Sequence, residues 1–305
     1  HNGDGDIDIL TIKENAVVIL DYDVINGITV IATGVTFPSS YYGKVHWADL
    51  NGDLALDFIL GRKIYLKVNG AYKESSFLLP DLLSNIILDD MTGDGLMDIV
   101  SGGYESYDGT TVSILVNLGD GHFDVNAVTM PASNLRSGTI TLLDADGDSD
   151  LDIFAADLYN RGWIFRNALA QNGALQFLST KVSSEYITRA VAGDVNSDGL
   201  QDIVIAGGNN ISILKNTSTP SSISFTEETH EELIDAIISL ALVDTDLDND
   251  LDIHFKTHSY TNGSQNLLFK NGSAAAGAVP GIPGNLVSAI TDIVSLSWTS
   301  VPGIL

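Results

Sequence analysis

The chain has 305 residues, of which 44% are hydrophobic, and a formal net charge of −26. This composition is that of a globular protein, and the length fits one large β domain or two smaller ones. The acidic balance argues against nucleic acid as a partner, because such a surface needs clustered Lys and Arg. The sequence has no Cys, so the fold uses no disulfide. No apolar run reaches the ~18 residues that a membrane span needs.

A nine-residue acidic pattern occurs six times along the chain. Its clearest copy runs from Asp194 to Asp202, with oxygen-bearing side chains at the first, third, fifth and ninth positions. Short oxygen ligands at every second residue can surround one hard cation. A Gly at the sixth position permits the tight turn, and the ninth residue closes the shell. The pattern therefore predicts up to about one calcium ion per repeat.

The predicted ligands share these four positions, and the first copy lacks its leading Asp, which would precede His1. They are Asn2, Asp4 and Asp8; Asp49, Asn51, Asp53 and Asp57; Asp90, Thr92, Asp94 and Asp98; Asp144, Asp146, Asp148 and Asp152; Asp194, Asn196, Asp198 and Asp202; and Asp244, Asp246, Asp248 and Asp252. The seventh residue is expected to add its carbonyl, from Ala55, Leu96, Asp150, Leu200 and Asp250.

The sequence around each copy predicts strands, so the loop is not an EF-hand. An EF-hand needs a bidentate Glu at position twelve and a helix on either side. No copy has that Glu, and short β-branched runs flank the loops. In the second repeat we expect strands at Lys44 to Ala48, Asp57 to Leu60 and Ile64 to Val68, and a fourth near Tyr72 to Ser76.

The spacing of the copies predicts a repeat architecture. From Asp49 onward they start 41, 54, 50 and 50 residues apart. A fixed period of this size indicates one supersecondary unit repeated, as in solenoids and propellers. Four antiparallel strands cannot bury both faces alone, whereas radially stacked sheets do so and leave only short edges. We therefore predict an all-β propeller of four-stranded blades.

The motif Asp-x-Asp/Asn-x-Asp-Gly-x-x-Asp between strands resembles the FG-GAP/VCBS repeats of β-propellers, as in integrin alpha subunits and many secreted bacterial proteins. The segment from Ser113 to Phe123 is similar to the family's ending of strand, Asn, Gly-x-Gly and Phe, and weaker versions occur around Asn167 and Asn216. The resemblance covers residues 1–272. It implies six visible blades, the first without its innermost strand. We expect a seven-bladed ring in a longer parent protein, with six or eight blades as alternatives.

The C-terminal residues differ in amino-acid composition from the repeats. Residues 273–279 are Ala-rich and predict a linker. Residues 280–305 resemble the first two strands of a fibronectin type III domain, with Trp298 at the family's core Trp. The alternative is an apolar tail that pairs with the propeller. Because His1 opens within a repeat and the fibronectin-like segment is truncated at residue 305, we expect the chain to continue into further domains at both ends.

The loops should differ in affinity and serve mainly as structural supports. Asp residues concentrate in the loops at Asp144 and Asp244, which should bind calcium most tightly. Thr92 replaces a ligand and Leu54 replaces the turn Gly, so those two loops should be weaker. Loops distributed around a ring favour ions that pin hairpins over ions that switch a surface on. Weak calcium loops are useful where calcium is roughly millimolar, which favours an extracellular location, secreted or at the cell surface.

A partner-binding surface is expected on the rim opposite the metal loops, since loops between strands two and three share that edge with the blade connections. Arg and aromatic residues are the usual anchors of interfaces. The candidates there are Arg62, Tyr104, Tyr107, Arg136, Tyr159 and Arg161, with Arg189 nearby. Ordinary loop composition is the alternative explanation.

The predicted function is a non-enzymatic calcium-stabilised module that mediates adhesion or binds a protein or glycan. A purely architectural spacer or display module is one alternative. A polysaccharide-active enzyme such as a lyase is another, because some calcium-loop propellers are enzymes. The sequence contains no nucleophile elbow, zinc-protease motif or phosphate loop, and its six His residues are scattered.

Overall fold

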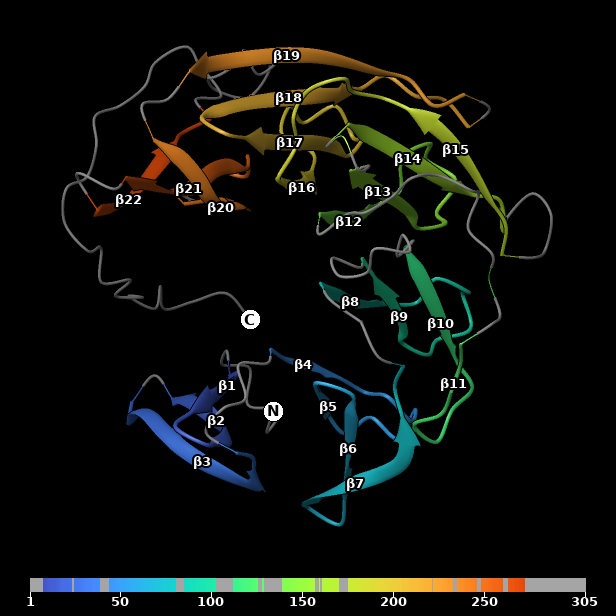
Figure 1. Cartoon of the computed structure of the whole chain (residues 1–305), viewed down its shortest axis with the longest axis vertical. Coiled ribbons are helices and arrows are strands. Elements are labelled where there is room, and N and C mark those ends of the chain that lie inside the picture. The colour runs from blue at the N-terminus through green and yellow to red at the C-terminus, as the bar shows by residue number, and fades with distance from the viewer. Residues whose placement is uncertain are drawn as a thin grey trace. The chain divides into compact units, whose positions relative to one another are not determined.

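The structure is a computed structural model that describes residues 8–23, 25–38, 44–80, 85–102, 112–125, 128, 139–156, 159, 161–169, 175–220, 222–232, 235–245, 248–259 and 263–271. Within these ranges the fold is all β, in six sheets of three or four strands. Each sheet is a meander of strands in chain order (Figure 1). These sheets are the blades of a β-propeller, which confirms the predicted fold class. Over the same ranges no helix is long and apolar enough to cross a membrane.

The chain divides into two compact units of three blades each. In the first unit, blade 1 comprises β1 (Ile9–Lys13), β2 (Ala16–Asp23) and β3 (Gly27–Thr36). Blade 2 comprises β4 (Val45–Ala48), β5 (Asp57–Leu60), β6 (Lys63–Val68) and β7 (Ala71–Leu78). Blade 3 comprises β8 (Ile86–Asp89), β9 (Asp98–Ser101), β10 (Ser113–Asn117) and β11 (Phe123–Asp124).

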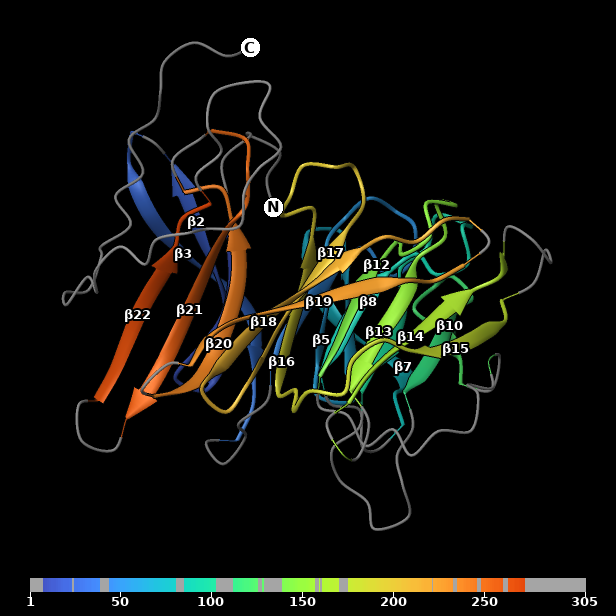
Figure 2. The same ribbon diagram turned by 90° about the horizontal axis from the view of Figure 1, so that it is seen from above.

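The second unit holds blades 4 to 6. Blade 4 comprises β12 (Ile140–Leu143), β13 (Asp152–Ala156), β14 (Gly162–Asn167) and β15 (Phe177–Lys181). Blade 5 comprises β16 (Arg189–Gly193), β17 (Asp202–Gly207), β18 (Asn210–Asn216) and β19 (Phe225–Glu232). Blade 6 comprises β20 (Ala236–Val243), β21 (Asp252–Ser259) and β22 (Gly263–Phe269), which lie side by side in Figure 2.

The four strands expected in the second repeat are confirmed to within two residues at each end, and β5 has the expected bounds. Blade 1 has three described strands, and its β1 follows the acidic pattern as a second strand should. The predicted linker at 273–279 and the fibronectin-like segment at 280–305 lie outside the described residues, so both stay predictions.

The second strand of the middle blade in each unit packs against both neighbouring blades. In β17, Ile203 and Ile205 join a buried cluster with blade 4, whereas Val204 and Ala206 join one with blade 6. Successive side chains of a strand point to opposite faces, so a continuous apolar run buries both faces of the sheet. The same alternation occurs in β5, where Phe58 faces blade 1 and Ile59 faces blade 3. A middle blade therefore depends on its neighbours for burial.

Shortening a side chain at a blade interface should destabilise the protein. Phe154 is fully buried in the cluster between blades 4 and 5, so Phe154→Ala should cost about 3–5 kcal/mol through the cavity that it leaves. Denaturant unfolding measures this cost. Leu178→Ala is the control, because Leu178 in neighbouring β15 is 51% exposed. Similar losses for both variants would contradict the interface assignment.

Candidate metal-binding loops

The five complete acidic patterns each connect the first and second strands of a blade. We number them by blade, as loop 2 (Asp49–Asp57), loop 3 (Asp90–Asp98), loop 4 (Asp144–Asp152), loop 5 (Asp194–Asp202) and loop 6 (Asp244–Asp252). The first residue follows the end of one strand, and the ninth begins the next. Each loop thus sits within a β-hairpin, as the sequence predicts.

The carboxylate of the first Asp in each loop accepts hydrogen bonds from backbone N–H groups of the turn. In loop 4, Gly147 and Asp148 donate their N–H groups to Asp144 Oδ1 at 2.8 and 3.1 Å, and Ser149 donates to Oδ2 at 2.9 Å. The sixth residue makes the equivalent bond in all five loops, over 2.7–3.0 Å. The carboxylate therefore organises the turn before any cation is considered.

The sixth residue of every loop has a left-handed backbone. Its φ is 87° at Gly95 and 89° at Gly199, but also 67° at Leu54, 72° at Ser149 and 71° at Asn249. This region disfavours residues other than Gly by roughly 1–2 kcal/mol. Leu54 is 93% exposed and still adopts it, with its N–H on Asp49. The bonds to the first Asp thus form the turn even where Gly is absent.

The ninth Asp is fully buried in each of the five loops. In loop 4, Asp152 Oδ2 accepts the N–H of Ala145 at 2.9 Å, and Oδ1 accepts that of Asn167 on the third strand at 2.6 Å. The same two bonds recur at Asp57, Asp98, Asp202 and Asp252. Each ninth carboxylate therefore ties its loop to the third strand.

Burial raises the pKa of a carboxyl, since desolvation disfavours the charged form. It raises the pKa of Asp152 to about 8 and those of Asp57 and Asp202 to about 6, and it also raises that of Asp98. Other Asp residues of the same loop add to the rise, and the two backbone hydrogen bonds oppose it. The metal-free loops thus carry negative charge that the fold disfavours.

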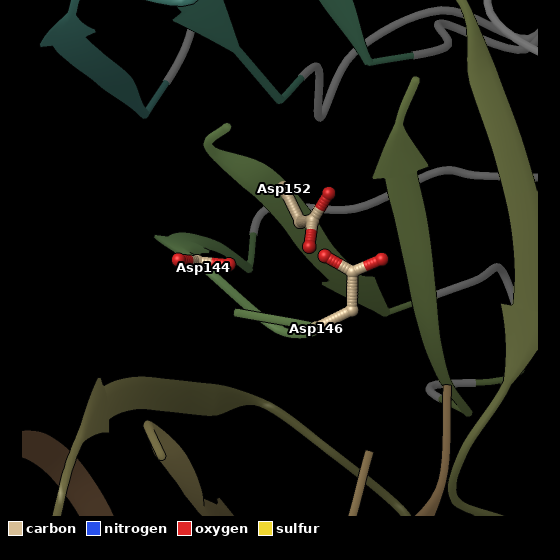
Figure 3. A group of neighbouring side chains, drawn as sticks. All are labelled: Asp144, Asp146 and Asp152. Carbon is tan, nitrogen blue, oxygen red and sulfur yellow. The ribbon is translucent and has the colours of Figure 1, made fainter. Parts of the chain in front are cut away.

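Loop 4 brings three carboxylates together. One oxygen from each of Asp144, Asp146 and Asp152 lies within 4.8 Å of the other two, and Figure 3 shows the carboxylates of Asp146 and Asp152 facing each other. Calcium binds oxygen at about 2.3–2.6 Å, so two oxygens on one ion lie at most about 5 Å apart. The spacing therefore fits a single calcium ion.

Asp146 supplies a second sign that loop 4 suits a cation. Its side chain is 1% exposed, and Oδ1 has no hydrogen-bond partner. Oδ2 lies 3.2 Å from Arg166 Nη1, and the pKa of Asp146 is raised to about 6, chiefly by burial. An unsatisfied buried carboxylate oxygen is costly. A cation bound between Asp144 and Asp152 would satisfy it, so the residues present fit calcium.

The remaining predicted ligands have more local roles in the structure. The fifth residue accepts the N–H of the seventh in every complete loop, over 2.9–3.2 Å, at Asp53, Asp94, Asp148, Asp198 and Asp248. Thr92 donates to Asp90 Oδ1 at 3.4 Å, and Asp8 accepts the N–H of Tyr22 at 3.3 Å, as a ninth Asp does. Asn2, Asp4 and Asp246 lie outside the described residues. Within the described ranges, only loop 4 forms a cluster of three carboxylates.

Of the predicted rim residues, Tyr104, Tyr107 and Arg136 lie outside the described residues. Arg62 Nε donates to the carbonyl of Leu79 at 2.6 Å, and so supports its own blade. In the second unit, the Arg161 guanidinium lies 4.9 Å from the ring centre of Tyr159, whose side chain is 64% exposed. The structure thus brings together one Arg–Tyr pair of the predicted set.

The sequence reasoning missed a contact between neighbouring blades. An Asn at the end of the third strand, or two residues after it, donates from Nδ2 to the carbonyl of the second residue in the preceding loop. Asn117 donates to Leu50 at 3.2 Å, Asn216 to Ala145 at 3.0 Å, and Asn271 to Val195 at 2.7 Å. Recurrence of Asn after an apolar run was the available signal.

Comparison with known proteins agrees with this geometry. A family model described as FG-GAP-like repeat matches residues 90–155 and 194–255, which hold loops 3 and 4 and loops 5 and 6. The match agrees with the resemblance to FG-GAP repeats that the sequence predicts. No curated protein sequence matches the chain at a significant level.

Solved structures with similar folds have low sequence identity to this chain. An Agrocybe aegerita lectin, described for specific recognition of non-reducing terminal N-acetylglucosamine, is 16% identical with a TM-score of 0.56, over 83% of this chain and 70% of the lectin. The V. cholerae biofilm matrix protein Bap1 is 17% identical with a TM-score of 0.41, over 88% of this chain and 36% of its own. BBS1N, solved in complex with ARL6DN, is 13% identical with a TM-score of 0.46, and the match covers 83% of this chain and 74% of BBS1N. At 16% identity, the likeness to the lectin concerns the fold alone.

The metal-free protein should lose stability as the pH rises from about 5 to about 8. The folded state binds protons more tightly than the unfolded chain at Asp152, Asp202, Asp57 and Asp146, because their pKa values are raised. Their stabilising contribution is therefore present below the unfolded pKa and is lost as the pH passes the folded one. Thermal melts in chelator should fall by several degrees across this range.

Asp152→Asn is the matched variant for the pH experiment, since it removes the group with the highest of these pKa values and keeps the side-chain shape. Its melting temperature should depend less on pH than that of the wild type. A wild-type melting temperature that stayed constant or rose over this range would contradict the burial argument.

Proposed function

We propose that the chain is a calcium-stabilised, non-enzymatic propeller module of a secreted or cell-surface protein. The observation that carries the proposal is loop 4, where three carboxylates converge and a buried oxygen of Asp146 has no hydrogen-bond partner. FG-GAP-like repeats are typical of extracellular calcium-binding propellers, which supports the same reading. Calcium at these loops has a structural role.

Calcium, when bound, supplies positive charge to a group of carboxylates that the fold has already gathered. In loop 4 Asp144, Asp146 and Asp152 would hold it, and corresponding residues would hold it in the other complete loops. The ninth Asp is the ligand most closely tied to the fold, because it is buried and accepts an N–H from the third strand. With a cation present, it can stay ionised while accepting both backbone N–H groups.

Removal of calcium should lower the melting temperature. Binding to the native state adds stability by mass action, so a melt in millimolar calcium should exceed one in excess EDTA by several degrees. Asp146→Asn should shrink this difference, because it removes a ligand from loop 4. Asp120→Asn is the control, since Asp120 is exposed and outside the loops. Equal melts for wild type with and without calcium would contradict the proposal.

We further propose that the module binds a glycan or protein through a surface that includes Tyr159 and Arg161. An exposed Tyr beside an Arg is a common anchor of interfaces, and aromatic rings also stack on sugars. The fold also occurs in a lectin that recognises N-acetylglucosamine. Glycans are therefore the first class of ligand to screen.

A glycan array that includes non-reducing terminal N-acetylglucosamine provides the test. Any specific binding should weaken about tenfold or more in Tyr159→Ala/Arg161→Ala, since truncating an interface anchor typically costs more than 1 kcal/mol. Tyr186→Ala is the control, because Tyr186 is similarly exposed at 58%. Binding that survives the double variant unchanged would place the ligand elsewhere.

An architectural spacer is the second candidate, and a specific observation favours it. Two Arg residues expected to face a partner bind the protein's own backbone instead. Arg62 donates to Leu79, and Arg189 donates to the carbonyls of Ile238 and Thr188 at 3.0 and 2.6 Å. A spacer should bind nothing specifically on glycan and protein panels, yet still respond to calcium in the melt.

A further inference from the structure

In the second unit, Asn216 connects loop 5 to loop 4, and Asn271 connects loop 6 to loop 5. Asn216 ends β18 and is 1% exposed. Its main-chain N–H donates to Asp202 Oδ1 at 2.8 Å, and its Nδ2 donates to the carbonyl of Ala145 at 3.0 Å. Asp202 is the ninth residue of loop 5, and Ala145 is the second residue of loop 4. A single buried residue therefore touches both loops.

The side chain of Asn216 is held in one orientation. Besides its bond to Ala145, Nδ2 donates to the carbonyl of Gln201 at 3.0 Å, and Oδ1 accepts the N–H of Ser218 at 2.9 Å. Both amide hydrogens and the amide oxygen are thus used. A fully satisfied buried amide is rigid, so displacement of one neighbouring loop moves the groups bonded to the other.

The contacts form a continuous path between the ninth carboxylates. Ala145 donates its own N–H to Asp152 Oδ2 at 2.9 Å, so Asp152, Ala145, Asn216 and Asp202 are linked by three hydrogen bonds. All four residues are at most 1% exposed. Water therefore does not interrupt the path from loop 4 to loop 5.

The path repeats from loop 5 to loop 6. Val195 donates its N–H to Asp202 Oδ2 at 3.2 Å, and its carbonyl accepts from Asn271 Nδ2 at 2.7 Å. The N–H of Asn271 in turn donates to Asp252 Oδ1 at 2.8 Å. Three successive loops of the second unit are thus joined through Asn216 and Asn271, which we call the Asn relay.

A second bond joins loops 4 and 5. Gln201 Oε1 accepts the N–H of Asp144 at 2.8 Å. Asp144 is the first residue of loop 4, and Gln201 directly precedes Asp202 in loop 5. The two loops are therefore held at both the first and the second residue of loop 4.

We propose that cation binding by loops 4 and 5 is cooperative and that Asn216 of the Asn relay carries the coupling. This inference rests on the proposed function, since it concerns the same loops. A cation bound at loop 5 fixes the Asp202 carboxylate and with it Asn216, whose side chain holds Ala145 of loop 4. The first ion has then already ordered part of loop 4. The second ion loses less binding free energy to ordering this loop, which is positive cooperativity. Asn216 acts as a positioning residue.

Two glycines allow the sites to be read separately. Gly147 of loop 4 donates its N–H to Asp144 Oδ1 at 2.8 Å, and Gly199 of loop 5 donates to Asp194 Oδ2 at 2.9 Å. In the full chain labelled with ¹⁵N-glycine, their amide resonances should each shift when calcium is titrated into chelator-treated protein. The midpoint of each shift gives the affinity of its own loop.

The experiment disables loop 5 and measures loop 4. Asp198→Asn removes a predicted ligand of loop 5 and should raise the calcium midpoint at Gly147 about fivefold or more, the lower end of common coupling energies. In the Asn216→Ala background, the same Asp198→Asn change should shift the Gly147 midpoint much less than it does in the wild type. Asn210→Ala, at the exposed start of the same strand, should preserve the coupling.

Gln201→Met provides a second variant with less risk to folding, because Gln201 is only partly buried and Met has a similar shape. It removes the bond to Asp144 and should reduce the coupling without abolishing the Gly199 response. A purely structural role for these residues would change the melting temperature but not the dependence of one loop on the other.

Three results would overturn the inference. If both glycines respond to calcium but Asp198→Asn leaves Gly147 unchanged, the loops are independent, and the proposed calcium binding stands without the coupling. If the coupling persists in both Asn216→Ala and Gln201→Met, the relay is not its route. If neither glycine responds to calcium, the proposed function fails and the coupling fails with it.

Discussion

A carboxylate buried at the start of the second strand is the constraint on which the rest of the structure depends. Each ninth Asp is fully buried, and it accepts one N–H from its own loop and one from the third strand. Those two bonds define where the hairpin turns and where the third strand ends. They satisfy the oxygens but leave the charge uncompensated, which is why the pKa of Asp152 is raised to about 8.

The ninth Asp marks the boundary between the acidic loop and the apolar core of each blade. In β13 and β17 the ninth Asp is followed at once by a wholly buried apolar run, and in β17 its side chains alternate between two blade interfaces. Carboxylates thus collect at one end of each blade, and hydrophobic packing occupies its middle. A cation at the loop would neutralise the charged end without disturbing that packing. The net charge of −26 is in large part the charge of these loops.

Much of the fold could be predicted from the sequence because the determining signals are local. Strand alternation and the nine-residue spacing lie within one repeat, so β5 and the hairpin around loop 2 were placed to within a residue or two. The Asn relay could not be predicted in this way, since it joins residues 71 and 76 positions apart, in different blades. Nor could spacing reveal that Leu54 adopts the turn of a Gly, because hydrogen bonds to Asp49 impose it. The rim prediction was weakest: composition placed Arg62 near a surface, but the nearby Leu79 carbonyl determines its contact.

The most direct measurement is the number of calcium ions that the chain binds, by elemental analysis after equilibrium dialysis in millimolar calcium. Metal binding by the acidic loops predicts several ions per chain, up to one for each complete loop, and about one fewer when Asp144 and Asp152 are both changed to Asn. A wild-type chain that retained no calcium, or a double variant that bound as many ions as the wild type, would contradict it.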